Sequence, residues 1–200
     1  IVHIDAVFLS LSLMKNVSDE EFNSLFPNEI SDHSKIFWSP RKAIETAVNW
    51  LDGCKNILDI GSGNGKFCLI GSHLIDAKFT GVEIRETLVL HAQGVAQSTK
   101  SKTSFIHDDI KNIDCSLYDG FFFYNSFGEH ICTSGSFDNQ IENSDDVYDF
   151  YQNILTEKLK TTKAGTHFVT HNNEGLFMPD SFQLQEMTED NELTLWIKTK

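Results

Sequence analysis

The sequence has little positive charge, few prolines and no long apolar run. It contains 16 lysines and arginines against 29 aspartates and glutamates, and the formal net charge of −13 disfavours a large electropositive surface for DNA or RNA. No apolar run reaches the roughly 18 residues that a membrane-spanning helix needs, so we expect no membrane partner. At 200 residues, 40% of them hydrophobic, the chain is typical of one soluble globular domain.

Cysteines are few, and their spacing is not that of a metal site. There are four, and none forms a CxxC pair or stands at a metal-ligand spacing from histidine: Cys54, Cys68, Cys115 and Cys132. Cys68 lies in an apolar helical pattern, where we expect a buried thiol. This usage favours a reducing compartment, and we predict a cytoplasmic protein without a metal.

The N-terminal stretch 1–14 is apolar but lacks the basic region and the small-residue cleavage site of a signal peptide. We expect it to pack against the main domain as a strand or a helix. A short acidic helix is predicted around residues 19–26, closed by Pro27. Ser39 and Pro40 are typical of an N-cap and a first helical residue, and they predict a helix that runs to about Leu51.

From residue 56 onward, short β runs alternate with helical stretches. Strands are predicted at 57–60, 78–84, 103–107, 121–125 and 166–171, and helices at 66–74, 85–97 and 145–160. Such alternation predicts right-handed βαβ units and a mainly parallel sheet covered by helices on both faces. Two further strands, 182–187 and 192–198, predict a C-terminal antiparallel hairpin. The expected fold is therefore α/β, with a seven-stranded, mostly parallel sheet.

A glycine-rich turn follows the first of these strands, in Asp59-Ile60-Gly61-Ser62-Gly63-Asn64-Gly65-Lys66. Glycines permit positive φ angles and let a ligand approach the backbone closely. The phosphate-binding pattern GxxxxGK[ST] is not met, because Phe67 follows Lys66. The dinucleotide pattern GxGxxG fails as well, because Lys66 stands where its third glycine would be. A plain turn between strand and helix is the alternative to a binding loop.

Acidic residues end the next two predicted strands. Glu83 comes 18 residues after Gly65, where a carboxylate can accept hydrogen bonds from both hydroxyls of a ribose. Enzymes that bind NAD share such an acid, so Glu83 indicates a nucleoside without naming it. Asp108 and Asp109 end the strand after that.

Together these residues resemble motif I and the following strand ends of the class I S-adenosylmethionine (SAM) methyltransferases. The resemblance covers about residues 39–172, and the C-terminal hairpin is similar to the reversed seventh strand of that Rossmann-like fold. It implies SAM as the cofactor and methyl transfer as the activity. It also implies a cofactor site that comprises Asp59, Gly61, Ser62, Gly63, Gly65, Glu83, Ile84, Asp108, Asp109 and Ile110.

The resemblance also suggests roles within this site. The acid of the loop, Asp59, would organise the loop and the contacts to the ammonium group. An acid after the third strand meets the adenine amino group; we favour Asp108, with Asp109 capping the next turn, and Ile110 packing on the ring. Residues 1–38 would form an N-terminal segment and lid, and residues 39–200 the methyltransferase domain. Trp38 would stack on the methionine end of SAM, or alternatively anchor the N-terminal segment to the core.

The end of the fourth predicted strand is where we expect the chemistry. Phe121–Phe123 is predicted to be core, whereas Tyr124 and Asn125 reach the catalytic edge. The stretch Asn125–Gly128 partly resembles the Asn-Pro-Pro-Tyr/Phe loop of amino-methylating enzymes, but it lacks both prolines. It is more similar to the Asn-Asn-Phe loop of the non-SET histone-lysine methyltransferases. We predict Asn125 and Tyr124 as catalytic residues, with Asn125 also contacting the cofactor.

The sequence also contains candidates for a general base that takes a proton from the methyl acceptor. These candidates are Glu129, His130 and His171, of which we predict His130, because an imidazole titrates near neutral pH. Residues 138–149 are acidic, and we interpret them as a solvated loop and helix start, or else as a surface for a basic substrate.

The acceptor itself is not identified by the sequence. Trp38-Ser39-Pro40 and Lys66-Phe67-Cys68 further resemble uncharacterised bacterial methyltransferase-like proteins, which do not specify one. The negative charge favours a protein amine or a small molecule over nucleic acid. Two alternatives are a SAM- or nucleoside-binding module without catalysis and a nicotinamide-dependent reductase. Lys66, which stands in place of the third glycine, argues against the reductase, and so does the C-terminal hairpin.

Overall fold

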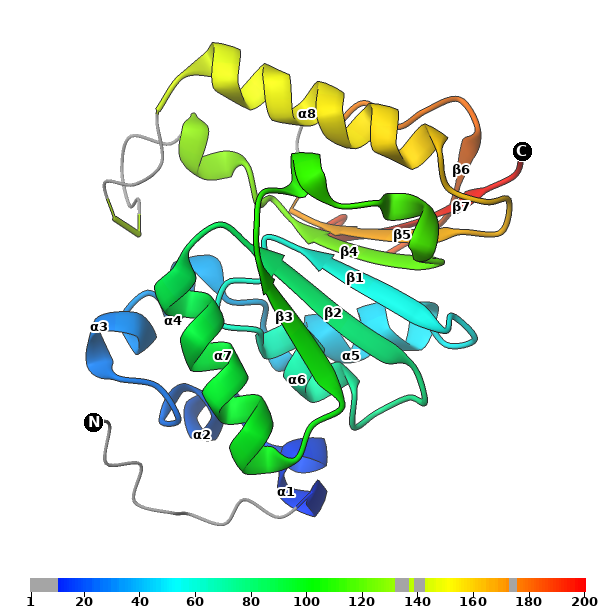
Figure 1. Ribbon diagram of the computed structural model, residues 1–200. Helices are drawn as coiled ribbons and strands as arrows, with labels where there is room; N and C mark the ends of the chain where they lie inside the picture. The colour runs from blue at the N-terminus through cyan, green and yellow to red at the C-terminus, as the bar shows by residue number, and fades with distance from the viewer. Residues whose placement is uncertain (1–10, 132–136, 139–142, 173–175) are drawn as a thin grey trace.

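The computed structural model describes residues 11–131, 137–138, 143–172 and 176–200, without the side chains of residues 11–13, 35 and 36. These residues contain one seven-stranded sheet in the order β3-β2-β1-β4-β5-β7-β6 (Figure 1). The strands are β1 (Asn56–Ile60), β2 (Lys78–Glu83), β3 (Thr103–His107), β4 (Gly120–Tyr124), β5 (His167–His171), β6 (Phe182–Met187) and β7 (Leu193–Lys198). The first five are parallel, whereas β7 runs antiparallel to both of its neighbours. The predicted α/β fold with its C-terminal hairpin is confirmed.

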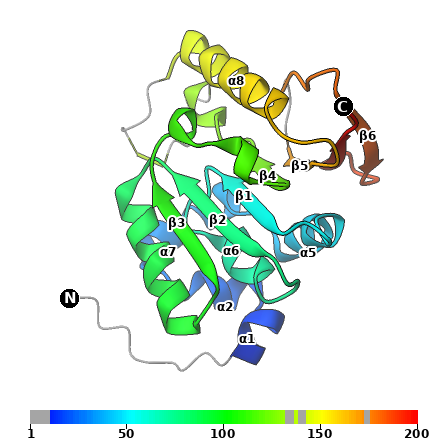
Figure 2. The same ribbon diagram turned by 45° about the vertical axis from the view of Figure 1, so that its right-hand side comes forward.

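Helices cover both faces of the sheet, as predicted (Figures 1 and 2). One face carries α5 (Arg41–Trp50), α6 (Lys66–Gly71) and α7 (Glu86–Thr99). The other carries α8 (Asp145–Lys160) and the 3-10 helices η1 (Ile110–Asn112), η2 (Cys115–Leu117) and η3 (Gly128–His130). Neighbouring strand residues such as Ile57 and Leu58 belong to different buried clusters, one on each face. This alternation is what strands buried on both sides require, and Phe121–Phe123 is buried as expected.

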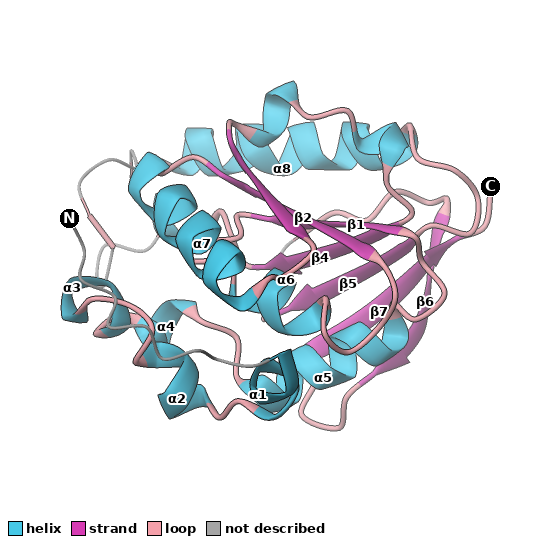
Figure 3. Ribbon diagram, turned by 60° about the horizontal axis from the view of Figure 1, so that its bottom comes forward, coloured by secondary structure: helices cyan, strands magenta, loops and turns pink. Residues whose placement is uncertain are grey.

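Four short helices lead into the domain: α1 (Leu11–Asn16), α2 (Asp19–Asn23), α3 (Asn28–Ser31) and α4 (Ser34–Phe37). Their buried side chains, Phe22 among them, belong to the same cluster as α5 and α6. The Asp19 carboxylate accepts hydrogen bonds from the backbone N–H of Arg41 at 3.0 Å and from Nζ of Lys66 at 2.5 Å. Lys66, which breaks the dinucleotide pattern, thus ties α2 to the end of the glycine loop. Figure 3 shows these helices beside α5–α7.

Several predicted boundaries are wrong by a few residues. The N-cap of α5 is Pro40, not Ser39: its ψ is 148°, and its carbonyl accepts the first helical bond from Ile44 N–H. Helix α6 ends at Gly71 rather than at residue 74, and a Cβ at Gly71 would lie 2.6 Å from the Phe79 ring. Because β2 lies so close, only glycine fits at the end of this helix without a shift of its neighbours.

Three of the four cysteines lie in the described part of the chain, and all three are buried and unpaired: Cys54, Cys68 and Cys115. The prediction for Cys68 is confirmed, and Cys132 lies outside the described residues. Within the described ranges, no helix is long and apolar enough to cross a membrane. The same ranges contain no group of three His, Cys, Asp or Glu side chains placed to hold a metal ion.

Candidate functional site

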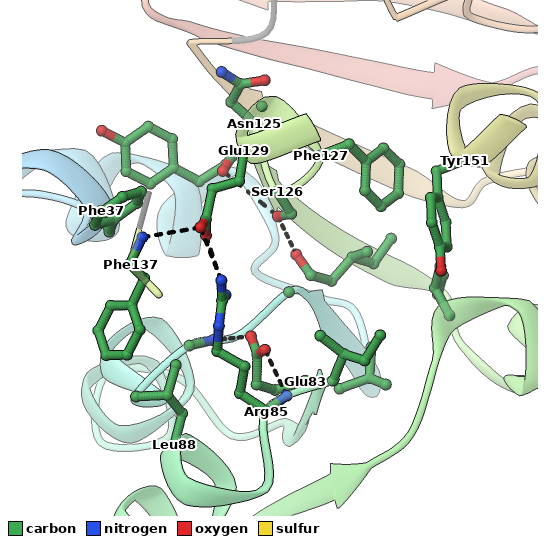
Figure 4. Close-up of a pocket in the computed structure, with 18 of the residues that line it drawn as sticks. Phe37, Glu83, Arg85, Leu88, Asn125, Ser126, Phe127, Glu129, Phe137 and Tyr151 are labelled. Atoms are coloured by element: carbon green, nitrogen blue, oxygen red, sulfur yellow. Dashed lines mark hydrogen bonds and ion pairs between the residues drawn. The ribbon is translucent and has the colours of Figure 1, made fainter. Parts of the chain in front are cut away.

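A cavity of about 390 Å³ lies across the carboxyl ends of the parallel strands (Figure 4). Its volume is within the roughly 300–1,000 Å³ of small-molecule sites, and its place is where open α/β sheets bind their ligands. Most of the residues predicted from the sequence line it: Trp38, Gly61, Gly63, Glu83, Ile84, Asp108, Asp109, Ile110, Tyr124, Asn125 and His130.

Three predicted cofactor residues do not line this cavity: Asp59, Ser62 and Gly65. Gly65 has φ +81°, and a Cβ there would lie 2.4 Å from Cζ of Phe105, so this glycine permits packing. Ser62 is buried, and its backbone N–H donates to Val82 O. Asp59 is buried beside Cys68, whose Sγ donates to it at 3.6 Å. The contacts given for these three residues are to other parts of the protein, and direct contact with a ligand stays a prediction for them.

The other two glycines bring the backbone close to the cavity. Gly61 has φ +68°, and a Cβ there would lie 2.4 Å from Cβ of Ser126, in the segment after β4. Ser126 Oγ in turn donates to Ile60 O at 2.5 Å, which seats this segment on the end of β1. Gly63 has φ +55°, and a Cβ there would meet no protein atom within 4 Å. Gly63 is therefore the point where the loop leaves room for a ligand.

Glu83 places a buried carboxylate in the cavity wall. Its Oε2 accepts from Gly63 N–H at 3.0 Å and its Oε1 from Arg85 N–H at 2.9 Å. Each carboxylate oxygen has a second lone pair, so the group can still accept from two neighbouring hydroxyls. Burial raises the pKa of Glu83 above its usual value, against the effect of these hydrogen bonds. The side chain and its spacing from the loop fit the predicted ribose contact.

Two acidic residues line the β3 end of the cavity, and they differ in their hydrogen-bond partners. Asp109 caps η1 through Lys111 N–H at 2.9 Å, as predicted, and also accepts from the hydroxyl of Tyr151 at 2.6 Å. Asp108 accepts at Oδ1 from the Asp109 N–H and from Asn112 Nδ2, both at 2.7 Å. Asp109 is the more heavily engaged of the two, which favours Asp108 as the residue that contacts a ligand.

His130 lies close to this β3 end. Its imidazole stacks on Tyr151, with the ring centroids 5.2 Å apart, and Phe127 stacks on the same tyrosine at 5.3 Å. Figure 4 shows Phe127 and Tyr151 together on one side of the cavity and Asn125 away from them. The role of His130 as a base for a nucleophile beside Asn125 therefore stays a prediction.

The ends of β4 and β5 form the other side of the cavity. Asn125 and Asn172 both line it, with φ angles of +38° and +47° that few residues other than asparagine and glycine adopt. Tyr124 also lines it, and its ring stacks on His171 at 4.2 Å. His171 is buried behind Tyr124 and does not line the cavity, and burial lowers its pKa. Two amide groups and a phenol therefore line this side of the cavity.

Trp38 anchors the N-terminal segment to the core, whereas stacking on the methionine end of SAM stays a prediction. Its ring packs edge-on against Phe26 at 5.3 Å and against Phe22 at 6.0 Å, which anchors the N-terminal helices. It also lines the cavity, as does the neighbouring Phe37.

Sequence reasoning missed several residues of the cavity wall, chiefly Asn64, Arg85, Phe137 and Tyr151. Arg85 stands two residues after Glu83, and a basic residue this close to a strand-end acid is a signal that could have been used. Tyr151 has none, because it comes from the middle of α8 and meets Asp109 only through the fold.

A pH-dependent stability is expected from Asp59. Burial, with a smaller contribution from Glu83, raises the pKa of its carboxyl from 3.8 to about 8. Between these two values the folded protein holds a proton that the unfolded chain releases, so stability falls as pH rises, by at most about 1.4 kcal/mol per unit. Asp59→Asn, a neutral isostere, is expected to remove most of this slope in urea denaturation at pH 5, 6, 7 and 8.

The matched control is Asp52→Asn, which changes an exposed carboxyl just before the same strand. It is expected to keep the wild-type slope. Parallel curves for wild type and Asp59→Asn would show that Asp59 is ionised throughout this range.

The sheet order and the cavity at its carboxyl edge define the Rossmann-like methyltransferase fold, and comparisons with known proteins agree. In structure the chain is similar to an RNA methyltransferase from Salinibacter ruber in complex with S-adenosyl-L-homocysteine (18% identity, TM-score 0.59), covering 81% of this chain and 94% of that one. It is similar to the PH0226 protein from Pyrococcus horikoshii OT3 (15% identity, TM-score 0.56), covering 90% and 99%. TehB from Haemophilus influenzae gives 15% identity and a TM-score of 0.55, covering 86% and 67%.

The sequence comparison identifies the family. Residues 51–196 match the model of a methyltransferase domain, which is most of the chain, and the chain belongs to this family. No curated protein matches it in sequence. The matched range begins directly after α5, so the helices α1–α5 lie outside it.

Proposed function

We propose that this protein transfers a methyl group from SAM to a small-molecule or protein acceptor. The observation that carries the proposal is the pairing of Glu83 with Gly63: a buried carboxylate and an open glycine, joined by a hydrogen bond, in the wall of one cavity. The half-exposed side chain of Ile84 adds an apolar surface for a flat ring beside Asp108. Membership of the methyltransferase family supports the same cofactor.

When bound, SAM supplies a methyl group activated on a sulfonium. The protein's part is to hold nucleophile and methyl group in line, and such positioning provides most of the acceleration in reactions of this kind. Glu83, Gly63 and Asp108 fix the nucleoside half, and Ser126 seats the acceptor segment on β1. Asn125 and Tyr124 then orient the nucleophile from the carboxyl end of β4.

The acceptor is proposed to be a protein amine or a small molecule. Of the charged residues in the wall, four are acidic, namely Glu83, Asp108, Asp109 and Glu129, and Arg85 is basic. Arg85 is already paired with Glu129 and Asp138, so it offers no free charge for phosphate. This agrees with the net charge of −13. The unpaired buried thiols support a cytosolic location as part of the same proposal.

Calorimetric titration with SAM, S-adenosylhomocysteine (SAH) and NAD tests the cofactor. Binding of the first two and not of NAD is expected; binding of NAD alone would favour a reductase. Radiolabelled SAM with pools of basic peptides, small amines and structured RNA then tests the acceptor. Labelled RNA would overturn the proposed acceptor class, and SAM binding without any labelled product would favour a binding module.

Asn125→Ala is expected to separate binding from transfer. Because Asn125 is an exposed residue at the acceptor side, SAM affinity should stay within about twofold, while methyl transfer slows by about 100-fold, as when one oriented donor is lost. Asn191→Ala is the control, since it removes another asparagine of positive φ (+61°) in the distant β6–β7 turn. Loss of SAM binding in Asn125→Ala would show that its predicted contact with the cofactor outweighs its role toward the acceptor.

A further inference from the structure

A largely buried ion pair joins the two sides of the cavity. The guanidinium of Arg85 holds the carboxylate of Glu129 at both oxygens, with Nη1–Oε1 at 3.0 Å and Nη2–Oε2 at 2.8 Å. Arg85 Nε also binds Oδ2 of Asp138 at 3.1 Å, and Glu129 Oε2 accepts from Phe137 N–H at 3.0 Å. The side chains are 8% (Arg85) and 16% (Glu129) exposed, so salt screens this pair less than a surface pair. Such two-point, charge-assisted contacts fix geometry strongly.

This ion pair lies across the end of the strand from which the glycine loop begins. Arg85 lies between β2 and α7, and Glu129 lies in η3 after β4. In the sheet, β1 lies between β2 and β4, so the pair spans the end of β1, where the glycine loop begins. Figure 4 shows it as the link between the Glu83 side and the Asn125 side of the cavity. Arg85 and Glu129 both line that cavity.

Arg85 also acts on the ribose-binding residue. Its backbone N–H holds Oε1 of Glu83, while its side chain holds Glu129, four residues after Asn125. One residue therefore connects the carboxylate proposed for the ribose with the segment proposed for the acceptor. Separating these two sides of the cavity requires breaking both guanidinium–carboxylate contacts.

We propose that Arg85 and Glu129 are positioning residues that clamp the two sides of the cofactor cavity together and thereby set how long the cofactor stays bound. The inference rests on the proposed function, because it takes the cavity to hold SAM. In the folded protein the clamp keeps the segment after β4 at a fixed distance from Glu83. Without it, the two sides separate more often, and the ligand both enters and leaves faster.

The test measures association and dissociation rates of SAH by stopped flow, with the tryptophan fluorescence of the chain as the signal, to which Trp38 in the cavity wall contributes. The variants are Arg85→Met, Glu129→Gln and the double variant. Glu129→Gln is the more conservative substitution, because the amide oxygen can still accept from Phe137 N–H and the neutral side chain carries no unpaired charge. Glu157→Gln, which breaks the exposed pair with Lys160, is the matched control.

Each single variant is expected to raise the dissociation rate roughly tenfold, as one lost charge-assisted pair implies, without lowering the association rate. The double variant should be no faster than Arg85→Met alone, because that substitution already removes the contact with Glu129 as well as the one with Asp138. Unchanged dissociation or additive effects would overturn the clamp. A fall in association rate together with a lower Tm would show a merely structural role and overturn it too.

The same experiment distinguishes a failure of the proposed function from a failure of the clamp. If wild type does not bind SAH at all, the cofactor assignment is wrong and the clamp falls with it. If wild type binds SAH and the variants release it at the wild-type rate, the clamp alone is wrong.

Discussion

Glu83→Ala is expected to weaken SAM binding by about 1–3 kcal/mol, which is about 5- to 150-fold in Kd. The substitution removes two acceptors for the ribose hydroxyls and also frees Gly63 N–H, which Glu83 holds at 3.0 Å. Calorimetry with SAM and SAH measures the effect. Unchanged affinity would contradict the ribose assignment.

Two further variants sharpen this result. Glu83→Gln is expected to rescue little, because both carboxylate oxygens accept from backbone N–H groups and the amide NH2 must face one of these donors. Glu157→Ala removes an exposed glutamate and should bind SAM like wild type. An equal loss in Glu157→Ala would point to a general effect of charge.

The pH dependence of binding follows from the same residue. In the proposed complex the ribose hydroxyls donate to the ionised carboxylate, and burial raises the pKa of Glu83. Protonation therefore competes with binding at a higher pH than for an exposed glutamate, and SAM affinity should fall as the solution becomes acidic. Glu83→Ala should lose this dependence, whereas a parallel decline in that variant would assign it to another group.

The sheet was predictable because its signals are local. Each strand from β1 to β5 is a short run that contains β-branched or aromatic residues, and the glycines and acids at the ends of β1, β2 and β3 are adjacent to those runs in the sequence. Parallel strands bring all their carboxyl ends to one edge, so topology places Gly63, Glu83 and Asp108 around one cavity without any knowledge of side-chain contacts. Boundaries were less accurate, as at Pro40 and Gly71, because they depend on contacts with other elements.

The contacts that join different parts of the chain were not predictable. Arg85 and Glu129 are 44 residues apart, and Tyr151 and Asp109 are 42 apart, so no spacing rule connects them. The same limit explains Asp59, which motif resemblance assigned to the cofactor. Its orientation toward Cys68 depends on how α6 packs on β1. The sequence thus predicted the edge of the sheet at which the cavity lies, and tertiary packing decided which side chains of each motif line it.

Gly63→Ala is expected to weaken SAM binding by about 1–3 kcal/mol while costing the fold little more than the strain of its backbone. Gly63 has φ +55°, and a Cβ there would meet no protein atom within 4 Å, so the added methyl group projects into space that a ligand would use. A residue other than glycine in the left-handed region costs about 1–2 kcal/mol in stability. Calorimetry and urea denaturation measure the two quantities separately.

Gly165→Ala is the matched control for this experiment. Gly165 also has a positive φ, +85°, and a Cβ there would meet nothing within 4 Å, but it lies in the turn before β5, away from the cavity. Both variants should lose similar stability, because both place alanine in the same backbone region. Only Gly63→Ala should lose affinity for SAM. Equal affinities in the two variants would mean that no ligand approaches the loop at Gly63, and the glycine turn would then be a structural connection between β1 and α6.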